Sequence, residues 1–371
     1  MVLQNLRVVN FRVYTDCFFE FSEKMNIIKG DNGSGKTSLL EAMHVLALTK
    51  SFRTKNDMDV IKAKDNYFQV FGEFLSDAGQ TQTVNVNYTK NEGKKVLLNR
   101  VGLQKKTDIV GKIPVIVLSP ANQRITEGGP SVRRDFINRI IAQVDPEYFS
   151  ALIKYKKRML QRNRILYDYR QKENYTYDPY VESYDELIAE AADKIFHARV
   201  KFITDFTPIF QTFFKEIFHN GNDVSLRFQF NMNPGDGGYK KTFLLKLAKQ
   251  FRNDLFYGRT TSGPHLDQLT IKLGKNEVRQ VASQGEHKVV LVALKMAESQ
   301  FIGDMLNERI IFLLDDLFSL LDVKHCVNIL QEISRKNQTF ITTTDIESLR
   351  HFGFDPNEEN LNILNLPIGE S

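Results

Sequence analysis

Eight consecutive residues near the start of the chain have the types and spacing needed to bind phosphate. They read Gly30-Asp31-Asn32-Gly33-Ser34-Gly35-Lys36-Thr37, which fits the pattern Gly, four residues, Gly, Lys, Ser/Thr. Glycines let the backbone curl around phosphates, Lys36 can reach the β- and γ-phosphates, and the Thr37 hydroxyl can ligate Mg²⁺. We therefore predict a nucleoside-triphosphate site formed by these residues together with Ser38.

Two adjacent carboxylates supply a second part of the same chemistry. Asp315 and Asp316 directly follow the apolar run Ile310–Leu314. In the company of a phosphate loop, Asp315 would join Thr37 in holding Mg²⁺, and Asp316 would orient or deprotonate the attacking water. The alternative is a pair of solvent-facing aspartates after a core strand. Because both features occur in one chain, the sequence predicts a nucleoside triphosphatase that uses Mg²⁺.

A third candidate is the segment Ser283-Gln284-Gly285-Glu286, which opens an apolar helix. A serine and a glycine at a helix start offer a hydroxyl, free backbone N–H groups and a helix dipole, all of which suit a phosphate. On its own, the segment could equally well be an ordinary helix cap. Its place shortly before the carboxylates favours the catalytic interpretation, so we add Ser283 and Gly285 to Lys36 and Asp316 as candidate catalytic residues.

The elements around the phosphate loop have the pattern that the chemistry requires. Met25–Lys29 is typical of a short strand, and Ser38–Leu46 has the apolar spacing of a helix. A strand, a glycine-rich loop and a helix N-terminus together direct backbone N–H groups and the positive end of a helix dipole toward one point. This context argues against a chance match to a glycine-rich turn.

The rest of the chain predicts an α/β fold interrupted by helices. Residues 2–11 and 67–99 alternate apolar and polar positions, which predicts an antiparallel β-subdomain, and Ile113–Leu118 is typical of a buried strand. Residues 131–218 are helical and strongly charged. We therefore expect a P-loop ATPase head in two parts, residues 1–120 and 241–371, with a mostly α-helical arm domain, residues 121–240, inserted between them.

Charge and cysteine content limit the partners, the metal sites and the cellular location to be expected for this protein. The 371 residues carry a net charge of +5, which permits an acidic partner without demanding one. Only Cys17 and Cys326 occur, so neither a disulfide framework nor a zinc site is predicted and a cytoplasmic location is expected. The most basic stretch is Lys154–Arg164. It could be a solvated helix face, but its scarcity of acidic residues favours an anion-binding surface, with Arg53, Arg133 and Arg134 as further candidates for contact with the anion.

The order of these motifs resembles the ABC-type ATPase head, in the branch that contains SMC and Rad50 proteins. Within that branch the chain is similar to the RecF family of bacterial DNA replication and repair proteins. The markers in chain order are Asn10-Phe11-Arg12, the phosphate loop, Ser51-Phe52-Arg53-Thr54, Leu118-Ser119-Pro120, Gly129 to Phe136, Arg162-Asn163, Gly263-Pro264-His265, Ser283 to Glu286, Leu313 to Asp316 and Ser319 to Asp322.

The resemblance implies a function in recombinational repair, replication restart and the SOS response. It implies an ATP-dependent homodimer on duplex DNA near single-strand junctions, with little sequence preference, in which Ser283 and Gly285 of one subunit cap the γ-phosphate held by the other. It also implies weak, DNA-stimulated ATP hydrolysis, and RecO and RecR as partners in loading RecA. Arg12 and Arg53 match family positions near nucleotide or DNA, and we count Arg12 as nucleotide-binding.

Some residues depart from the family pattern. His287 stands where the signature usually has glutamine, Leu266 and Gln268 replace polar residues after the Gly-Pro-His turn, and a switch histidine after Thr342–Thr344 is absent.

A membrane-transporter ATPase subunit is the alternative function, but the missing histidine and the basic helical insert argue against it. The insert has no sustained heptads, which excludes a long coiled coil, and no Asn-Lys-x-Asp guanine reader occurs.

Overall fold

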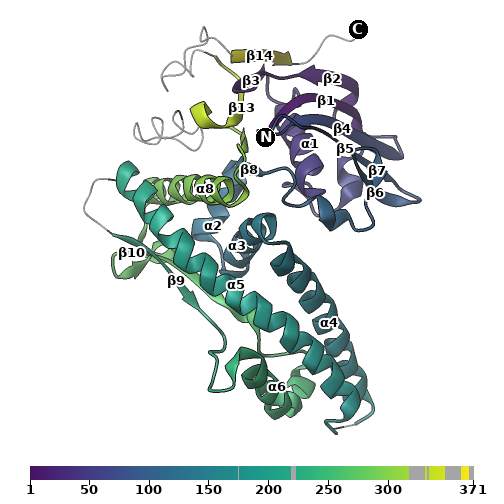
Figure 1. Cartoon of the computed structure of the whole chain (residues 1–371), viewed down its shortest axis with the longest axis vertical. Helices are drawn as coiled ribbons and strands as arrows, with labels where there is room; N and C mark the ends of the chain where they lie inside the picture. Colours follow the sequence, from purple (N-terminus) through teal and green to yellow (C-terminus); the bar gives the residue numbers. More distant parts are fainter. Residues whose placement is uncertain (174, 219–222, 317–330, 332–333, 347–360, 367–371) are drawn as a thin grey trace. The chain divides into compact units, whose positions relative to one another are not determined.

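The computed structural model describes residues 1–173, 175–218, 223–316, 331, 334–346 and 361–366. The chain divides into two units, each described here by itself (Figure 1). The first unit comprises Met1–Arg124, Ile209–Gly221 and Ala282–Ser371, and the second comprises Ile125–Pro208 and Asn222–Val281. The second unit is thus inserted within the sequence of the first, which confirms the predicted α/β head with a helical insertion.

A parallel five-stranded sheet forms the centre of the first unit, in the order β14-β3-β13-β12-β8. Its strands are β3 (Met25–Gly30), β8 (Val115–Leu118), β12 (Ile311–Leu314), β13 (Gln338–Thr343) and β14 (Leu361–Leu366). Strands β8 and β12 are buried along their whole length, which explains their continuous apolar sequences. Because all five strands run in one direction, the residues that follow β3, β12 and β13 lie at one edge of the sheet.

The antiparallel β-subdomain predicted from residues 2–11 and 67–99 is confirmed as a second sheet, in the order β2-β1-β4-β5-β6-β7. Its strands are β1 (Val2–Phe11), β2 (Tyr14–Glu20), β4 (Tyr67–Leu75), β5 (Thr81–Thr89), β6 (Gly93–Leu98) and β7 (Val101–Gly102). Along β4, Phe68, Val70 and Phe74 are buried while their neighbours are not, as a half-buried strand requires.

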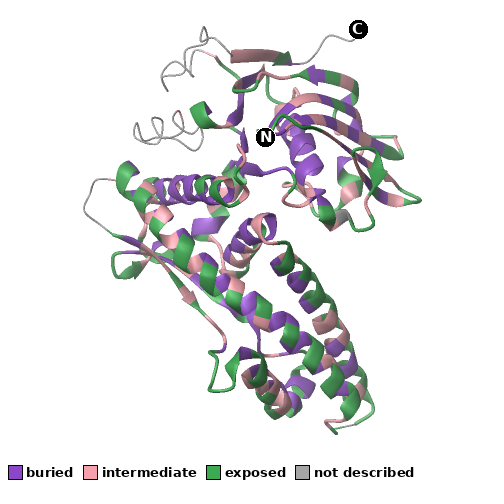
Figure 2. Cartoon of the chain, in the orientation of Figure 1, coloured by how far each residue is buried: buried purple, intermediate pink, exposed green. Residues whose placement is uncertain are grey.

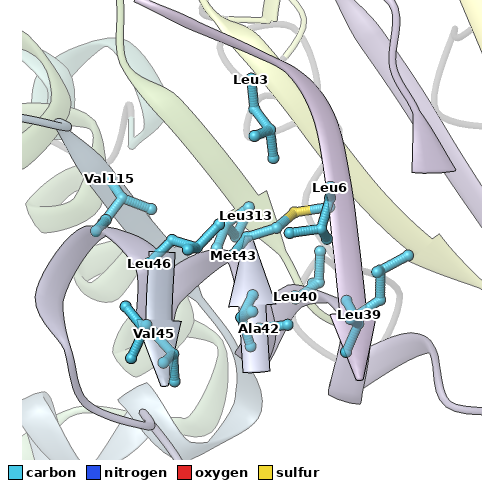
Figure 3. Close-up of a cluster of buried hydrophobic side chains, with 14 of the residues drawn as sticks. Leu3, Leu6, Leu39, Leu40, Ala42, Met43, Val45, Leu46, Val115 and Leu313 are labelled. Atoms are coloured by element: carbon cyan, nitrogen blue, oxygen red, sulfur yellow. The ribbon is translucent and has the colours of Figure 1, made fainter. Parts of the chain in front are cut away.

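Helix α1 (Lys36–Leu48) shares one hydrophobic core with both sheets. Figure 3 shows Leu39, Leu40, Ala42, Met43, Val45 and Leu46 of α1 with Leu3 and Leu6 of β1, Val115 of β8 and Leu313 of β12. The helix presents buried side chains on most of its circumference, so its position relative to the sheets is fixed by packing on several sides. The unit also contains α8 (Gln284–Leu306) and the 3₁₀ helices η1 (Asp57–Val60), η2 (Lys106–Ile109) and η3 (Pro120–Gln123).

The second unit is mostly helical. Its helices are α2 (Arg124–Glu127), α3 (Pro130–Val144), α4 (Pro146–Gln171), α5 (Pro179–Ile217, which continues into the first unit), α6 (Gly238–Tyr257), α7 (Val278–Val281) and the 3₁₀ helix η4 (Pro264–Leu266). A small antiparallel sheet in the order β11-β10-β9 completes it, with β9 (Val224–Gln229), β10 (Gln268–Leu273) and β11 (Asn276–Glu277).

Buried arginines tie the helices of the second unit together. Arg162 on α4 is fully buried and pairs with Asp185 of α5 at 2.5 Å and Asp254 of α6 at 2.7 Å. Arg199 on α5 pairs with Asp267 at 2.6 Å. A buried charge is stable only when it is paired and hydrogen-bonded. Removing one partner should therefore damage this unit, whose long helices show buried faces alternating with exposed ones in Figure 2.

The unit boundaries differ from those expected at residues 120 and 240. Residue 240 falls inside α6, a helix that the sequence analysis did not predict, and β10 belongs to the second unit. The physical reason is packing: Phe251 and Leu255 of α6 share a buried cluster with Ile165, Leu166 and Val181. Strands β9 and β14 were also not predicted, although Val224–Gln229 of β9 alternates apolar and polar residues and could have been recognised.

Two sequence predictions cannot be compared with the structure. The turn Ser319-Leu320-Leu321-Asp322 and the helix expected after it lie outside the described residues.

The strand expected from Gln338 to Thr344 is confirmed as β13. Within the described ranges, no helix is both long enough and apolar enough to cross a membrane.

Candidate nucleotide-binding site

The glycine-rich loop has the tight backbone that phosphate binding requires. Strand β3 ends at Gly30 and α1 begins at Lys36. Gly33 and Gly35 have φ values of 86° and 103°, a region that favours glycine. A Cβ atom on Gly35 would lie 2.8 Å from Val13 Cγ2 and 2.9 Å from the Tyr14 hydroxyl oxygen, so a larger residue would also collide with the turn between β1 and β2.

Lys36 lies over the loop that precedes it. Its Nζ donates hydrogen bonds to the backbone carbonyls of Gly30 at 2.6 Å and Asp31 at 2.8 Å. The Tyr14 hydroxyl donates to the Gly35 carbonyl at 3.1 Å, and burial raises the pKa of Tyr14, so this donor stays protonated. The Lys36 ammonium group therefore lies against the backbone of the glycine-rich loop, where a bound phosphate would contact it.

Asp315 lies directly after β12 and meets the first turn of α1. Its Oδ1 accepts hydrogen bonds from the hydroxyls of Thr37 at 2.8 Å and Thr342 at 3.1 Å. Burial raises the pKa of Asp315, and the hydrogen bonds from Thr37 and Thr342 oppose that shift. The structure thus brings together the two residues that the sequence analysis assigned to Mg²⁺, although they lie far apart in the chain.

The oxygen atoms at this point fit a magnesium ion. A hydroxyl and a carboxylate are hard ligands, and Mg²⁺ is usually held by one or two such groups plus substrate phosphates. Among the described residues, no group of three or more His, Cys, Asp or Glu side chains could hold a metal ion by itself. A metal at Thr37 and Asp315 would therefore need the phosphate oxygens of a nucleotide to complete its coordination.

Asp316 differs from its neighbour in backbone conformation and exposure. Its φ of 50° places it in the left-handed region, its side chain is exposed, and its backbone N–H donates to the Thr342 hydroxyl at 2.9 Å. Thr342 therefore contacts both aspartates, the side chain of Asp315 and the backbone of Asp316, and Asp315 is only 8% exposed. A left-handed non-glycine residue is uncommon and requires support from its surroundings. That geometry gives the two carboxylates different environments, as different roles would need.

The segment from Ser283 to Glu286 forms a complete helix cap. Ser283 is the N-cap of α8: its hydroxyl accepts from the Glu286 N–H at 3.3 Å, and Glu286 accepts from the Ser283 N–H at 2.8 Å. Gln284 accepts a hydrogen bond from Gln123 at 2.8 Å. Ser283 and Gly285 are exposed, and nothing lies within 4 Å of a Cβ built on Gly285. The cap interpretation is thus realised, and the surface over it is accessible to another molecule.

Arg12 contacts a carboxylate that the sequence analysis did not single out. Its Nε and Nη2 donate to the two oxygens of Glu41 at 2.8 and 2.7 Å, and its Nη1 donates to the Asp59 carbonyl at 2.6 Å. Glu41 lies on α1, is fully buried, and also accepts a hydrogen bond from Ser51. Arg53 approaches the same carboxylate at 3.5 Å.

Glu41 and Thr342 could have been found from the sequence. Glu41 is a charged residue inside the otherwise apolar run Leu39-Leu40-Glu41-Ala42-Met43, and Thr342 is a hydroxyl residue within a buried strand. Polar groups are buried only when they have partners, so each should have been examined for one.

Comparisons with known proteins agree with this geometry. Residues 2–355 match the family described as "RecF/RecN/SMC N terminal domain". The chain is 32% identical over 353 residues to "DNA replication and repair protein RecF" of Chloroherpeton thalassium, covering 93% of this chain and 95% of that protein. It is 31% identical to the protein of the same name from Bacteroides fragilis, covering 94% and 92%.

Solved structures give the same result. "Structure of the recombination mediator protein RecF-ATP in RecFOR pathway" superposes with a TM-score of 0.87 at 28% identity, covering 93% of this chain and 92% of that one. An SMC head bound to a winged-helix domain of ScpA superposes with a TM-score of 0.53 at 17% identity, covering 93% and 90%, and shows the fold alone. Neither group supports the transporter alternative.

The parallel sheet, the glycine-rich loop and the carboxylate after β12 define a P-loop ATPase head of the kind found in SMC proteins. Within that class, the chain belongs to the RecF/RecN/SMC N-terminal family and to its RecF branch, whose named members act in DNA replication and repair.

Proposed function

We propose that the protein is an ATP-dependent DNA-binding protein of recombinational repair and replication restart. ATP drives two copies to dimerise on duplex DNA near single-stranded gaps, and slow hydrolysis releases them. RecO and RecR are the proposed partners in loading RecA. The observation that carries the proposal is the contact between Thr37 and Asp315 beside the Lys36 loop, because it joins the phosphate-binding and metal-binding groups at one point.

Each residue of the site has a role in this proposal. The residues from Gly30 to Ser38 bind the ATP phosphates, with Lys36 exchanging its loop carbonyls for phosphate oxygens. Thr37 and Asp315 would hold Mg²⁺, which neutralises the charge on the β- and γ-phosphates. Asp316, which is exposed, orients the attacking water. Arg12 contributes positive charge near the loop.

A second copy would complete the site. Ser283 and Gly285 lie at an exposed helix N-terminus, where backbone N–H groups and the helix dipole favour an anion. In the proposed dimer this helix start contacts the γ-phosphate held by the partner. Dimerisation then depends on ATP, because the γ-phosphate is part of the interface.

Three of the arginines considered for DNA binding are buried or half-buried and have partners within the protein, which argues against that role. Arg133 is buried and donates to the carbonyls of Leu269 and Gly128, and Arg162 is fully buried and ion-paired. Arg134 is half-buried and donates to the Asp267 carbonyl. The exposed residues remain as the DNA candidates: Arg53, and from the basic run of α4 Lys154, Lys156, Lys157 and Arg164.

A Lys36→Met variant tests the phosphate site. The substitution removes the only ammonium group that contacts the loop carbonyls in the described structure, so ATP affinity should fall at least tenfold while the thermal midpoint stays near that of the wild type. Titration with a fluorescent ATP analogue measures the affinity. As a control, Lys29→Met removes a neighbouring lysine that precedes the loop and should change the affinity much less. Unchanged affinity in Lys36→Met would refute the assignment.

A further inference from the structure

Helix α6 presents a strongly basic surface. Between residues 238 and 266 the only acidic residue is Asp254, which is buried and pairs with Arg162 at 2.7 Å. The exposed cations of this segment are Lys240, Lys241, Lys249, Arg252 and Arg259. Within the part of the chain that the structure describes, none of these five side chains forms an ion pair or a hydrogen bond. Their charges are therefore available to an anion.

The stability of the helix does not explain these cations. Positive charge is favourable near the C-terminus of a helix and unfavourable near its N-terminus. Lys240 and Lys241 lie in the first turn of α6, which contains no acidic residue. Asp193 of α5 accepts the backbone N–H of Lys240 at 3.2 Å, but it is one carboxylate beside two lysines. A contact outside the helix explains the two lysines better than a role within it.

Large apolar side chains lie between the cations. Residues three or four positions apart on a helix share a face. One such stripe along the exposed side of α6 is Lys241, Leu245, Lys249, Arg252 and Phe256. Phe256 is 69% exposed and the adjacent Tyr257 is 55% exposed, and their rings lie edge to face with centroids 5.1 Å apart. Exposed apolar groups rimmed by polar residues mark an interaction site.

The buried side of α6 holds this surface in place. Tyr239 stacks on Phe196 of α5, with ring centroids 4.4 Å apart. Phe251 meets the ring of Tyr177 at 5.3 Å, and buried and exposed residues alternate along the helix (Figure 2). Because packing fixes α6 within the second unit, the stripe is formed in a single copy of the protein without ATP.

Cations alternating with exposed aromatic rings suit an unpaired nucleic-acid strand. The cations attract phosphates, and the rings can stack on bases, whose faces are accessible in a single strand. A duplex would use the cations alone, because its bases are already stacked on one another. From Lys241 to Phe256 the stripe extends over about 22 Å at the rise of an α-helix, which is long enough for several nucleotides.

We propose that the exposed side of α6 binds single-stranded DNA. Phe256 and Tyr257 stack on bases, and Lys249 and Arg252 bind the phosphates between them. In the cell this surface would hold the unpaired strand of a gap, and that assignment rests on the function proposed above. The binding itself does not, because it needs neither ATP nor a second copy.

Binding of a labelled oligothymidylate to the nucleotide-free protein tests the stacking. A strand of about 15 nucleotides lies near the upper end of the site sizes of single-strand-binding domains. Phe256→Leu/Tyr257→Leu keeps the surface apolar but removes both rings, so the affinity measured by fluorescence anisotropy should fall at least about tenfold. The affinity for a blunt duplex of the same length should stay unchanged.

Tyr180→Leu is the matched control. Tyr180 is also 55% exposed and makes an edge-to-face contact, with Tyr184 at a centroid distance of 5.4 Å. Its neighbours in the sequence are the acidic residues Asp178 and Glu182 rather than cations. This variant should bind the oligonucleotide as tightly as the wild type.

A salt series tests the phosphate contacts through different residues, and it stays informative if the ring variant proves unstable. Log affinity for a single strand falls with log salt by about 0.7 for each phosphate neutralised. Lys249→Gln/Arg252→Gln removes two cations, so its salt slope should be shallower than that of the wild type by about 1.4. An unchanged slope would show that these cations do not bind the strand.

Other results would also overturn the inference. Unchanged oligonucleotide affinity in Phe256→Leu/Tyr257→Leu, or an equal loss of affinity for the duplex, would show that the rings do not stack on bases. An equal loss in Tyr180→Leu would show that the effect is not specific to α6.

The same assay distinguishes other ligands for this surface. If polyglutamate or phosphatidylglycerol vesicles bound the wild type as tightly as the oligonucleotide does, and lost affinity in Lys249→Gln/Arg252→Gln, the ligand would be an acidic protein segment or a membrane, and the inference would be wrong. By contrast, failure of the wild type to bind ATP would refute the proposed function and leave the oligonucleotide result valid.

Discussion

At the scale of single residues, the two adjacent aspartates have opposite surroundings. Asp315 is buried and accepts two hydroxyl hydrogen bonds, whereas Asp316 is exposed and left-handed. The sequence predicted that these carboxylates would divide the work, but it could not show the means, which is Thr342 bonding to both residues. Contacts between distant segments of the chain cannot be read from local patterns.

We predict distinct effects when each carboxylate is neutralised. Asp316→Asn removes the charge that handles the water, so turnover should fall about 10²-fold or more while ATP still binds. Asp315→Asn should instead weaken the Mg²⁺ dependence of nucleotide binding, because it removes a charged ligand. Turnover assays and nucleotide titrations with and without Mg²⁺ separate the two effects. Finding them interchanged would reverse the assigned roles.

Asp315 should also make the nucleotide-free protein less stable at neutral pH. Its folded pKa is raised above the unfolded value, so the protonated form is favoured in the folded state. The stabilising contribution is then fully present below the unfolded pKa and is lost as the pH rises through the folded pKa. Asp315→Asn cannot ionise, so its thermal midpoint should exceed that of the wild type at pH 7, by a margin that shrinks as the pH falls toward 4. A lower midpoint in the variant at pH 7 would contradict this.

At the scale of elements, the sequence predicted best where one pattern determined both structure and chemistry. The strand, loop and helix at the phosphate site and the alternating strands of the β-subdomain are confirmed. The strand and the helix have continuous apolar runs on either side of the loop, and the strands of the β-subdomain follow a period of 2. Helix α6 was missed, although Phe243, Leu247, Phe251 and Leu255 recur every four residues on its buried face. Strand β9 was also missed, although its sequence alternates apolar and polar residues as a half-buried strand does, and it pairs with β10.

The start of α8 allows a test of the proposed dimer. Ser283→Arg should leave ATP binding by the monomer intact, since the phosphate loop is untouched, but should abolish ATP-induced dimers by crowding the partner's γ-phosphate. Ser283→Asp controls for loss of the cap, because aspartate caps helices as well as serine does. Its negative charge should still repel the γ-phosphate. Light scattering with and without ATP gives the mass. Dimers that persist in both variants would show that this helix start is not in the interface.

At the scale of the whole molecule, the structure confirms the predicted α/β fold class with a helical insertion. The motifs for ATP lie at strand ends and helix starts, where local sequence and position coincide. The boundaries of the units instead depend on which side chains pack together, such as Arg162 with Asp185 and Asp254. The basic run of residues 154–164 shows the same limit: its pattern predicted a charged helix, but not that Tyr155 and Arg162 would be buried in it.

In the proposed function, ATP controls DNA binding. The salt dependence of DNA affinity tests this control most directly. A net charge of +5 over 371 residues gives one copy little hold on a polyanion. Two copies on one duplex would neutralise more phosphates, and log affinity falls with log salt by about 0.9 for each phosphate neutralised. Affinity for gapped duplex DNA should be measured over a salt series, with a slowly hydrolysed ATP analogue and without nucleotide, alongside Lys36→Met as the control.

We predict weak binding without nucleotide, and tighter binding with a clearly steeper salt slope when the analogue is present. Base sequence should matter little, because phosphate contacts carry no sequence information. Lys36→Met should behave the same with and without the analogue. Equal affinity and equal slope for the wild-type protein under both conditions would contradict the coupling between the phosphate loop and DNA.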